Sequence, residues 1–157
     1  MKGKTVIVGV GNLLLRDEGV GVHVARALQE RALPVGTAVR ECGTTLLDCW
    51  DEFRDAEKVV IVDAVQGGEE PGSIYRIPGE ALAGDHRGGM SCHDIGIGEV
   101  LGLKWRGGPE VVVIGVEPAE IEWRLELSPP IQARLDRILD VVVEEATKPT
   151  RCNTGGR

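Results

Sequence analysis

Residues 5–30 of this 157-residue chain have the sequence TVIVGVGNLLLRDEGVGVHVARALQE. The first four form a continuous β-branched run, which is typical of a strand buried on both faces of a sheet. A glycine-rich turn follows, and residues 19–30 then repeat apolar side chains at helical spacing, which predicts an amphipathic helix. A buried strand followed at once by a helix is the first unit of an α/β protein.

Four later segments also have strand patterns, and strand-type and helix-type patterns alternate along the chain. Residues 58–62 and 111–114 are apolar throughout and predict strands buried on both faces. Residues 37–40 predict a weaker strand, and residues 73–77 predict a strand at an edge. This alternation predicts mainly parallel strands that are joined by right-handed crossovers.

Two more helices complete the pattern. Residues 46–53 predict a short helix, and Ser128 can cap a C-terminal helix that has Pro129 at its first position. Apolar residues at helical spacing give this last helix a core stripe, formed by Ile131, Leu135, Ile138, Leu139 and Val142. With helices on both faces of the sheet, the fold is predicted to be a three-layer α/β/α sandwich around a mainly parallel sheet.

Length and composition point to one ordinary globular domain, residues 1–147, followed by a polar tail at 148–157 that we expect to be flexible. The net charge of −7 argues against a nucleic-acid partner, whose phosphates require a basic surface. No apolar run approaches the roughly 20 residues that span a bilayer, so no membrane insertion is expected. The apolar stretch at the N-terminus is too short for a secretory signal, and we therefore expect a cytoplasmic protein.

The four cysteines are spaced without a Cys-x-x-Cys pair. In a cytoplasmic protein, free thiols are expected for Cys42, Cys49, Cys92 and Cys152. We assign none of them a catalytic role.

Three polar side chains are predicted to meet at one edge of the sheet. Glu18 follows the glycine-rich turn, Asp63 ends the third strand, and His93 follows a long glycine-rich loop at 79–89. In an open doubly wound sheet, ligands bind outside the carboxyl ends of the strands. If the strand order is the common 2-1-3-4-5, the loops after the first and third strands flank that crevice. Two carboxylates and an imidazole suit a divalent transition metal and leave positions open for substrate or water.

Each of these side chains also has an ordinary structural interpretation. Glu18 could belong to an acidic first turn that is stabilised by the helix dipole. Asp63 could cap the turn after its strand, and a lone histidine such as His93 is often structural or solvated.

Dinucleotide binding is disfavoured, although Gly9 and Gly11 match the start of the phosphate-binding fingerprint. Leu14 stands where the third glycine of that fingerprint belongs. Asp17 and Glu18 would also repel a pyrophosphate.

Several stretches together resemble the hydrogenase maturation endopeptidases. They are GVGNLLLRDEGVG at 9–21, VDA at 62–64, SCHDIG at 91–96, GVEPA at 115–119 and LSP at 127–129. The resemblance covers about residues 4–145, and the first stretch is long enough to be specific.

The resemblance implies a proteolytic function and a phosphorylase/hydrolase-like fold. Members of the family remove a C-terminal extension from the large-subunit precursor of nickel-iron hydrogenases after nickel has been inserted. The metal ligands of the family fall on Glu18, Asp63 and His93. Nickel is expected to arrive with the substrate, and another divalent metal could occupy the site. ECGT at 41–44 replaces the usual Asp-Gly-Gly-Thr, which makes Glu41 a further candidate catalytic residue.

The sequence leaves the mechanism open. Nickel could polarise the scissile carbonyl or lower the pKa of an attacking water. Alternatively, Glu18 or Asp63 could serve as the general base, as in an aspartic-type endopeptidase. A rival hypothesis is a nickel-sensing chaperone that binds the precursor without cutting it. A third is a stand-alone metallohydrolase for small substrates.

Overall fold

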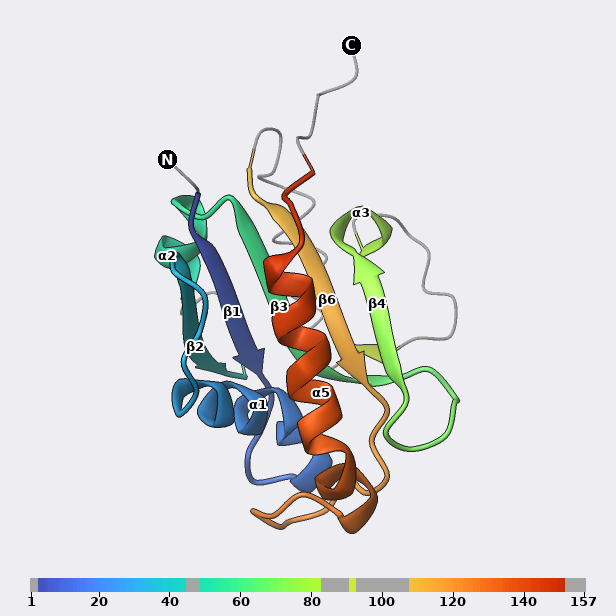
Figure 1. The fold of residues 1–157 in the computed structure, drawn as a ribbon. Coiled ribbons are helices and arrows are strands. Elements are labelled where there is room, and N and C mark those ends of the chain that lie inside the picture. The colour runs from blue at the N-terminus through green and yellow to red at the C-terminus, as the bar shows by residue number, and fades with distance from the viewer. Residues whose placement is uncertain (1–2, 45–48, 83–90, 93–107, 152–157) are drawn as a thin grey trace.

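The computed structural model describes residues 3–44, 49–82, 91–92 and 108–151 as an α/β fold (Figure 1). The strands are β1 (Thr5–Val10), β2 (Thr37–Gly43), β3 (Lys58–Gln66), β4 (Ile74–Pro78), β5 (Ser91–Cys92) and β6 (Glu110–Val116). The helical elements are the 3-10 turn η1 (Arg16–Gly19), α1 (Val20–Gln29), α2 (Trp50–Arg54), α3 (Gly79–Leu82) and α5 (Pro129–Thr147). Within these described ranges, no helix is both long enough and apolar enough to cross a membrane.

The main sheet has the order β2-β1-β3-β6-β4, and the short strand β5 pairs antiparallel with β3. The pairs β1–β2, β1–β3 and β3–β6 are parallel, whereas β4 runs antiparallel to β6. The predicted order 2-1-3-4-5 is correct for its first three strands and wrong for the last two, because β6 lies next to β3. After its first residue β6 is buried throughout and suits the interior of the sheet. β4 lies at the edge of the sheet, as predicted, and its exposed Arg76 and Pro78 are residue types that are typical of edge strands.

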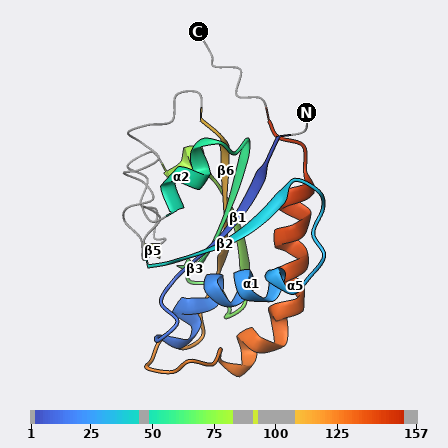
Figure 2. The same ribbon diagram turned by 90° about the vertical axis from the view of Figure 1, so that its left-hand side faces the viewer.

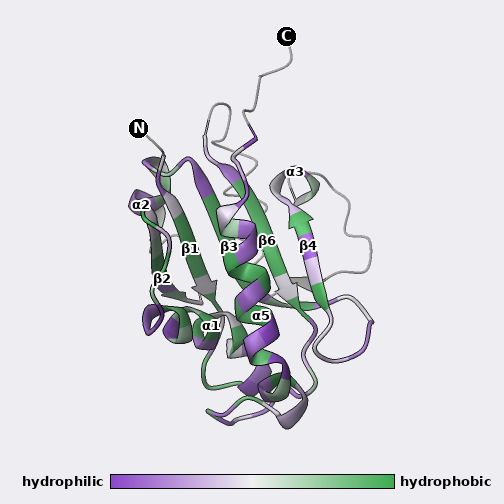
Figure 3. Cartoon of the chain, in the orientation of Figure 1, coloured by the Kyte–Doolittle hydropathy of each residue, from purple (hydrophilic) through white to green (hydrophobic). Residues whose placement is uncertain are grey.

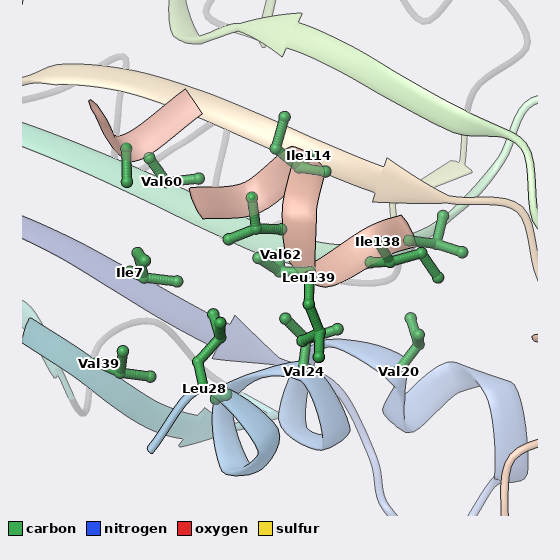
Figure 4. Packing of buried hydrophobic residues seen from close by; sticks show 14 of the residues in the cluster. Ile7, Val20, Val24, Leu28, Val39, Val60, Val62, Ile114, Ile138 and Leu139 are labelled. Atoms are coloured by element: carbon green, nitrogen blue, oxygen red, sulfur yellow. The ribbon is translucent and has the colours of Figure 1, made fainter. Parts of the chain in front are cut away.

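Helices cover both faces of the sheet, which confirms the predicted three-layer architecture. α1 and α5 lie on one face, and α2 lies on the other (Figure 2). On the first face, Val62 and Ile114 of the central strands belong to one core with Leu28 and Leu139 (Figure 4). On the second face, Phe53 of α2 belongs to a separate core. The central strands are therefore hydrophobic along most of their length, whereas α1 and α5 also carry hydrophilic residues (Figure 3).

Most elements differ from their predicted bounds by a few residues, and three of the differences change an earlier prediction. β3 continues to Gln66, so that Asp63 lies inside the strand, because β6 and β5 provide pairing partners beyond the apolar run. The predicted helix at 46–53 is α2, which begins at Trp50, and residues 45–48 are outside the described ranges. Residues 79–82 form α3, although a loop was predicted from residue 79 to 89, and 83–89 are outside the described ranges.

The prediction of free thiols is wrong for Cys42 and Cys49, which form a disulfide with Cα atoms 6.0 Å apart. Cys42 lies in β2 and Cys49 directly precedes α2. Their separation of seven residues matches no motif, and only the path of the chain brings their side chains within bonding range. The predictions for Cys92 and Cys152 stay untested, since the structure does not describe these side chains.

The first residues of the predicted flexible tail contact the domain. The backbone N–H of Arg151 donates to Glu110 Oε2 at 2.9 Å, and the Lys148 ammonium lies 3.1 Å from Glu145 Oε2. Residues 152–157 are outside the described ranges.

A buried ion-pair cluster fastens α5 to the amino-terminal end of the sheet. Glu145 and Lys58 are 2% and 1% exposed, and the Lys58 ammonium lies 3.4 Å from Glu145 Oε1. Arg76 of β4 donates to both carboxylate oxygens of Glu145 at 3.0 Å. Burial by itself would raise the pKa of Glu145. The hydrogen bonds from Arg76 and Lys148 and the charge of Lys58 outweigh burial and lower this pKa from 4.5 to about 2.

We expect Glu145→Gln to lower the free energy of unfolding by about 3–5 kcal/mol, because it leaves Lys58 buried without its counter-charge. Since the folded pKa lies below the ordinary value of 4.5, the stabilisation is complete above that pH and is lost as the pH falls toward 2. Urea unfolding across this range measures the difference between the wild type and the variant. Glu144→Gln, at an exposed position, is the control and should change stability by less than about 0.5 kcal/mol. A difference between wild type and Glu145→Gln that does not shrink in acid would contradict this account.

Candidate functional site

Glycines bring the turn after β1 into direct backbone contact with two strands. A Cβ atom on Gly21, near the start of α1, would overlap the carbonyl oxygens of Val10 and Val62. Gly11 has a φ of +146°, and a Cβ atom there would overlap the carbonyl oxygen of Glu18. Only glycine permits such approaches. The segment that carries Glu18 can therefore lie directly against the carboxyl-terminal ends of β1 and β3.

Glu18 and Asp63 lie on elements that contact each other at this edge of the sheet. Glu18 belongs to η1 and is 7% exposed, whereas Asp63 belongs to β3 and is fully buried. The β1–β3 pairing ends at Gly9 and Val62, so Asp63 is the first residue of β3 beyond it. The Oδ1 atom of Asp63 accepts a hydrogen bond from the N–H of Ala64 at 2.8 Å. The fold thus places both carboxylates at the carboxyl-terminal edge of β1.

The third predicted metal ligand, His93, is outside the described residues. Cys92, which precedes it in the sequence, pairs as part of β5 with Val65, two residues beyond Asp63. In the part of the chain that the structure describes, no group of three or more His, Cys, Asp and Glu side chains is arranged to hold a metal ion. The metal set Glu18, Asp63 and His93 therefore stays a prediction, because its third member is not described.

Glu41, the remaining candidate catalytic residue, is directed elsewhere. Its carboxylate lies 3.0 Å from the guanidinium of Arg26, which belongs to α1. Side chains alternate along a strand, so Glu41 shares the face of buried Val39, which packs in the core with α1. Asp63, by the same rule, shares the opposite face with Ile61. The fold does not bring Glu41 together with Asp63, and the contact that it shows is a partly exposed ion pair.

Asp17 is a residue whose importance sequence reasoning missed. Its carboxylate is fully buried and accepts hydrogen bonds from the N–H groups of Ala119, Glu120 and Ser128 at 2.9, 2.8 and 2.8 Å. It also accepts the hydroxyl hydrogen bond of Ser128, which therefore binds Asp17 rather than capping α5 as predicted. One side chain thus joins η1, the segment after β6 and the start of α5. Its position beside Glu18 was the only sequence signal.

Arg16 is a second residue that fixes this turn, through its unusual backbone conformation and its ion pairs. It is the only non-glycine residue with a positive φ, 55°, among the described residues. Its guanidinium is buried and lies 3.1 Å from Glu120 Oε2 and 2.9 Å from Glu122 Oε1. Such a backbone conformation persists only where the surroundings enforce it. The turn that ends at Glu18 is therefore held in one conformation from both sides.

Comparisons with known proteins agree on one family. A family model described as hydrogenase maturation protease matches residues 22–145. The chain is 33% identical over 147 residues to the hydrogenase expression/formation protein HoxM of Azotobacter vinelandii, covering 88% of this chain and 70% of that protein. It is 27% identical over 145 residues to the hydrogenase 2 maturation protease of Escherichia coli, covering 89% and 88%. Among solved structures, the NiFe hydrogenase maturation protease HybD of Thermococcus kodakarensis matches with a TM-score of 0.75 at 25% identity, covering 92% of this chain and 99% of that one.

We expect Asp17→Asn to lower the free energy of unfolding by about 3 kcal/mol. Both carboxylate oxygens accept hydrogen bonds, so the amide group of Asn would face a donor in either orientation. Ser128→Ala removes only the hydroxyl and should cost about 1 kcal/mol. Chemical denaturation of the two variants measures both values. Equal losses would show that Asp17 is not the junction described above.

Gly21→Ala should destabilise the protein by at least about 3 kcal/mol, because the added methyl group would overlap two backbone carbonyl oxygens that cannot move independently. Thermal unfolding, together with the yield of folded protein, measures the effect. Gly68→Asn is the matched control, because Gly68 has a φ of +84° and no atom within 4 Å of its added Cβ, and asparagine tolerates this conformation. A Gly21→Ala protein as stable as the control would exclude the close approach.

Proposed function

We propose a substrate and a reaction for this chain, which belongs to the hydrogenase maturation protease family and is therefore a hydrolase that cleaves peptide bonds within proteins. The proposed substrate is the nickel-loaded large-subunit precursor of a nickel-iron hydrogenase. The proposed reaction is hydrolysis of one peptide bond that removes a C-terminal extension. We place this reaction in the cytoplasm.

The observation that carries the proposal is the burial of Glu18 and Asp63 on contacting elements at one edge of the sheet. Carboxylates that are brought close together away from water repel each other when both are ionised. A divalent cation delivered by the substrate would offset that repulsion. Recognition of the metal would also restrict cleavage to the loaded precursor.

His93 is proposed as the third metal ligand. The pairing of Cys92 with Val65 supports this assignment, because it brings the chain alongside β3 near Asp63 immediately before His93 in the sequence. Two oxygen donors and one imidazole nitrogen are a suitable set for nickel and for other divalent transition metals. Three protein ligands also leave coordination positions to the substrate.

Two routes to hydrolysis fit these residues. In the first, nickel in the substrate acts as a Lewis acid on the scissile carbonyl or on the attacking water. In the second, the carboxylate of Glu18 or Asp63 accepts the proton of that water, which would place the enzyme with the aspartic-type endopeptidases. Glu18 and Asp63 belong to the catalytic centre in both routes.

The test is intact-mass spectrometry of a purified large-subunit precursor, with and without nickel, after incubation with this protein. We expect loss of one C-terminal fragment from the nickel-loaded precursor and none from the nickel-free form. Glu18→Gln, Asp63→Asn and His93→Ala should each slow processing by more than about 100-fold. The first two replace a charged carboxylate ligand with a neutral amide, and the third removes the imidazole nitrogen. Normal rates for both Glu18→Gln and His93→Ala would exclude the metal-guided reaction.

Two control variants sharpen this experiment. Glu41→Gln should process the precursor at close to the wild-type rate, because the carboxylate of Glu41 binds Arg26 on the other face of the sheet. Cys92→Ser should also be normal, since no chemistry is assigned to that thiol. A precursor that binds the wild type in a nickel-dependent way and keeps its full mass would instead favour the chaperone hypothesis. Tight metal binding by the isolated protein, with cleavage of small peptides, would favour the stand-alone metallohydrolase.

A further inference from the structure

An apolar patch lies exposed beside the turn that carries Glu18. Leu14, Ile121, Trp123 and Leu125, here called the apolar flange, are 51%, 38%, 78% and 61% exposed. Among the described residues, Val35 is the one other large hydrophobic side chain that is exposed. Scattered apolar side chains are normal on a protein surface, whereas a group gathered in one place marks an interaction site.

Backbone hydrogen bonds fasten the two segments of the flange to each other. The N–H of Arg124 donates to the Leu14 carbonyl at 3.0 Å, and the N–H of Arg16 donates to the Arg124 carbonyl at 2.9 Å, around an isolated bridge at Leu15. His23 of α1 lies with Nε2 3.0 Å from the Leu125 carbonyl oxygen. The segment between β6 and α5 and the segment between β1 and η1 lie at the same end of the molecule (Figure 1). The flange is thus a preformed surface, and binding to it costs little ordering of the chain.

Charged residues alternate with the apolar ones along the same segment and are here called the rim of the flange. Glu120, Glu122 and Glu126 are exposed, and Arg124, the exposed cation among them, lies 3.8 Å from Glu122 Oε1. Arg16 pairs with Glu120 and Glu122 but is itself buried beneath them. The segment therefore combines exposed apolar side chains with a net negative charge, because three carboxylates stand against the two cations Arg16 and Arg124.

We propose that the apolar flange is the docking surface for the folded body of the hydrogenase large-subunit precursor, which would offer exposed apolar side chains flanked by lysine or arginine. This rests on the proposed function. The physical link is the turn after β1, which carries Leu14 on its outer side and Glu18 four residues later. A protein bound to the flange is held beside the candidate catalytic carboxylate. Contacts with the flange, away from the scissile bond, would then provide specificity for the correct protein and would position its C-terminal segment.

A second copy of this chain is a poorer occupant than the precursor. A two-fold dimer places the same patch of both subunits in contact. Two rims formed by Glu120, Glu122 and Glu126 would then face each other, and like charges across an interface oppose association. Charge complementarity favours a partner with a basic rim.

The experiment compares the wild type with the double variant Trp123→Ser, Leu125→Ser. Processing of the nickel-loaded precursor gives kcat and KM, and biolayer interferometry with the same precursor gives Kd. We expect KM and Kd to rise at least tenfold while kcat stays within about twofold. Val35→Ser is the control for loss of exposed apolar surface and should match the wild type. Matching thermal unfolding midpoints would show that both variants are folded. Unchanged KM and Kd in the double variant would overturn the proposal.

Glu126→Lys tests the rim without touching the ion pairs of Arg16. We expect its Kd to rise severalfold at low salt and the effect to shrink as ionic strength increases. An unchanged or lower Kd at low salt would exclude a basic partner. Sedimentation velocity tests the alternative occupant by measuring the oligomeric state of each protein. A wild type that is dimeric and a double variant that is monomeric would overturn the proposal in favour of a second copy.

The same measurements separate this inference from the proposed function. If the wild type binds the precursor without cutting it and the double variant loses binding, the docking surface is supported and the endopeptidase proposal fails. If the wild type cuts the precursor and the double variant cuts it with the same KM, the endopeptidase proposal stands and the docking surface fails. A wild type that neither binds nor cuts the nickel-loaded precursor of its own organism overturns both.

Discussion

The carboxylate of Asp17 is the interaction on which the functional end of this molecule depends. It is fully buried, and its oxygens accept hydrogen bonds from Ala119, Glu120 and Ser128. A buried carboxylate is tolerable only when such donors satisfy it, so the three segments that meet here are stable only together. Glu18 follows Asp17 directly in η1. The position of the candidate catalytic carboxylate is therefore set largely by bonds that its neighbour makes.

The two ends of the sheet use buried charge for different purposes. At the amino-terminal end, three cations surround Glu145, and the cluster ties α5 to β3 and β4. At the carboxyl-terminal end, Glu117 accepts hydrogen bonds from the N–H groups of Gly67 and Gly68 and fixes the turn after β3. Glu18 and Asp63 lie buried at the same end. Ion pairing thus stabilises the first end, while backbone donors to Asp17 and Glu117, together with the ion pairs of Arg16, hold the second end in the shape that the proposed reaction requires.

In the proposed reaction, one short turn connects binding of the substrate protein with the chemistry. Its outer side carries Leu14, and its inner side carries Glu18, with strained Arg16 between them. Glycines at both ends of the turn allow it to press against β1 and β3. Because the turn has almost no room to move, a contact on its outer side and a carboxylate on its inner side keep a fixed relation. That rigidity suits the proposed cleavage of a single peptide bond.

The sequence by itself determined the α/β class and the edge at which the site forms. Continuous β-branched runs such as 58–62 are stable only as strands covered on both faces, and parallel strands end at a common edge, which brings Glu18 and Asp63 to the same place. The tertiary structure alone decided that β6 lies between β3 and β4, that β3 continues past Asp63, that Cys42 bonds Cys49, and that Glu41 turns to Arg26. Asp17 belongs to this second group, since its partner Ser128 lies 111 positions away. Local sequence patterns reflect burial and backbone preference over a few residues. The order of strands and the buried hydrogen bonds depend instead on which distant segments of the chain pack together in the folded protein.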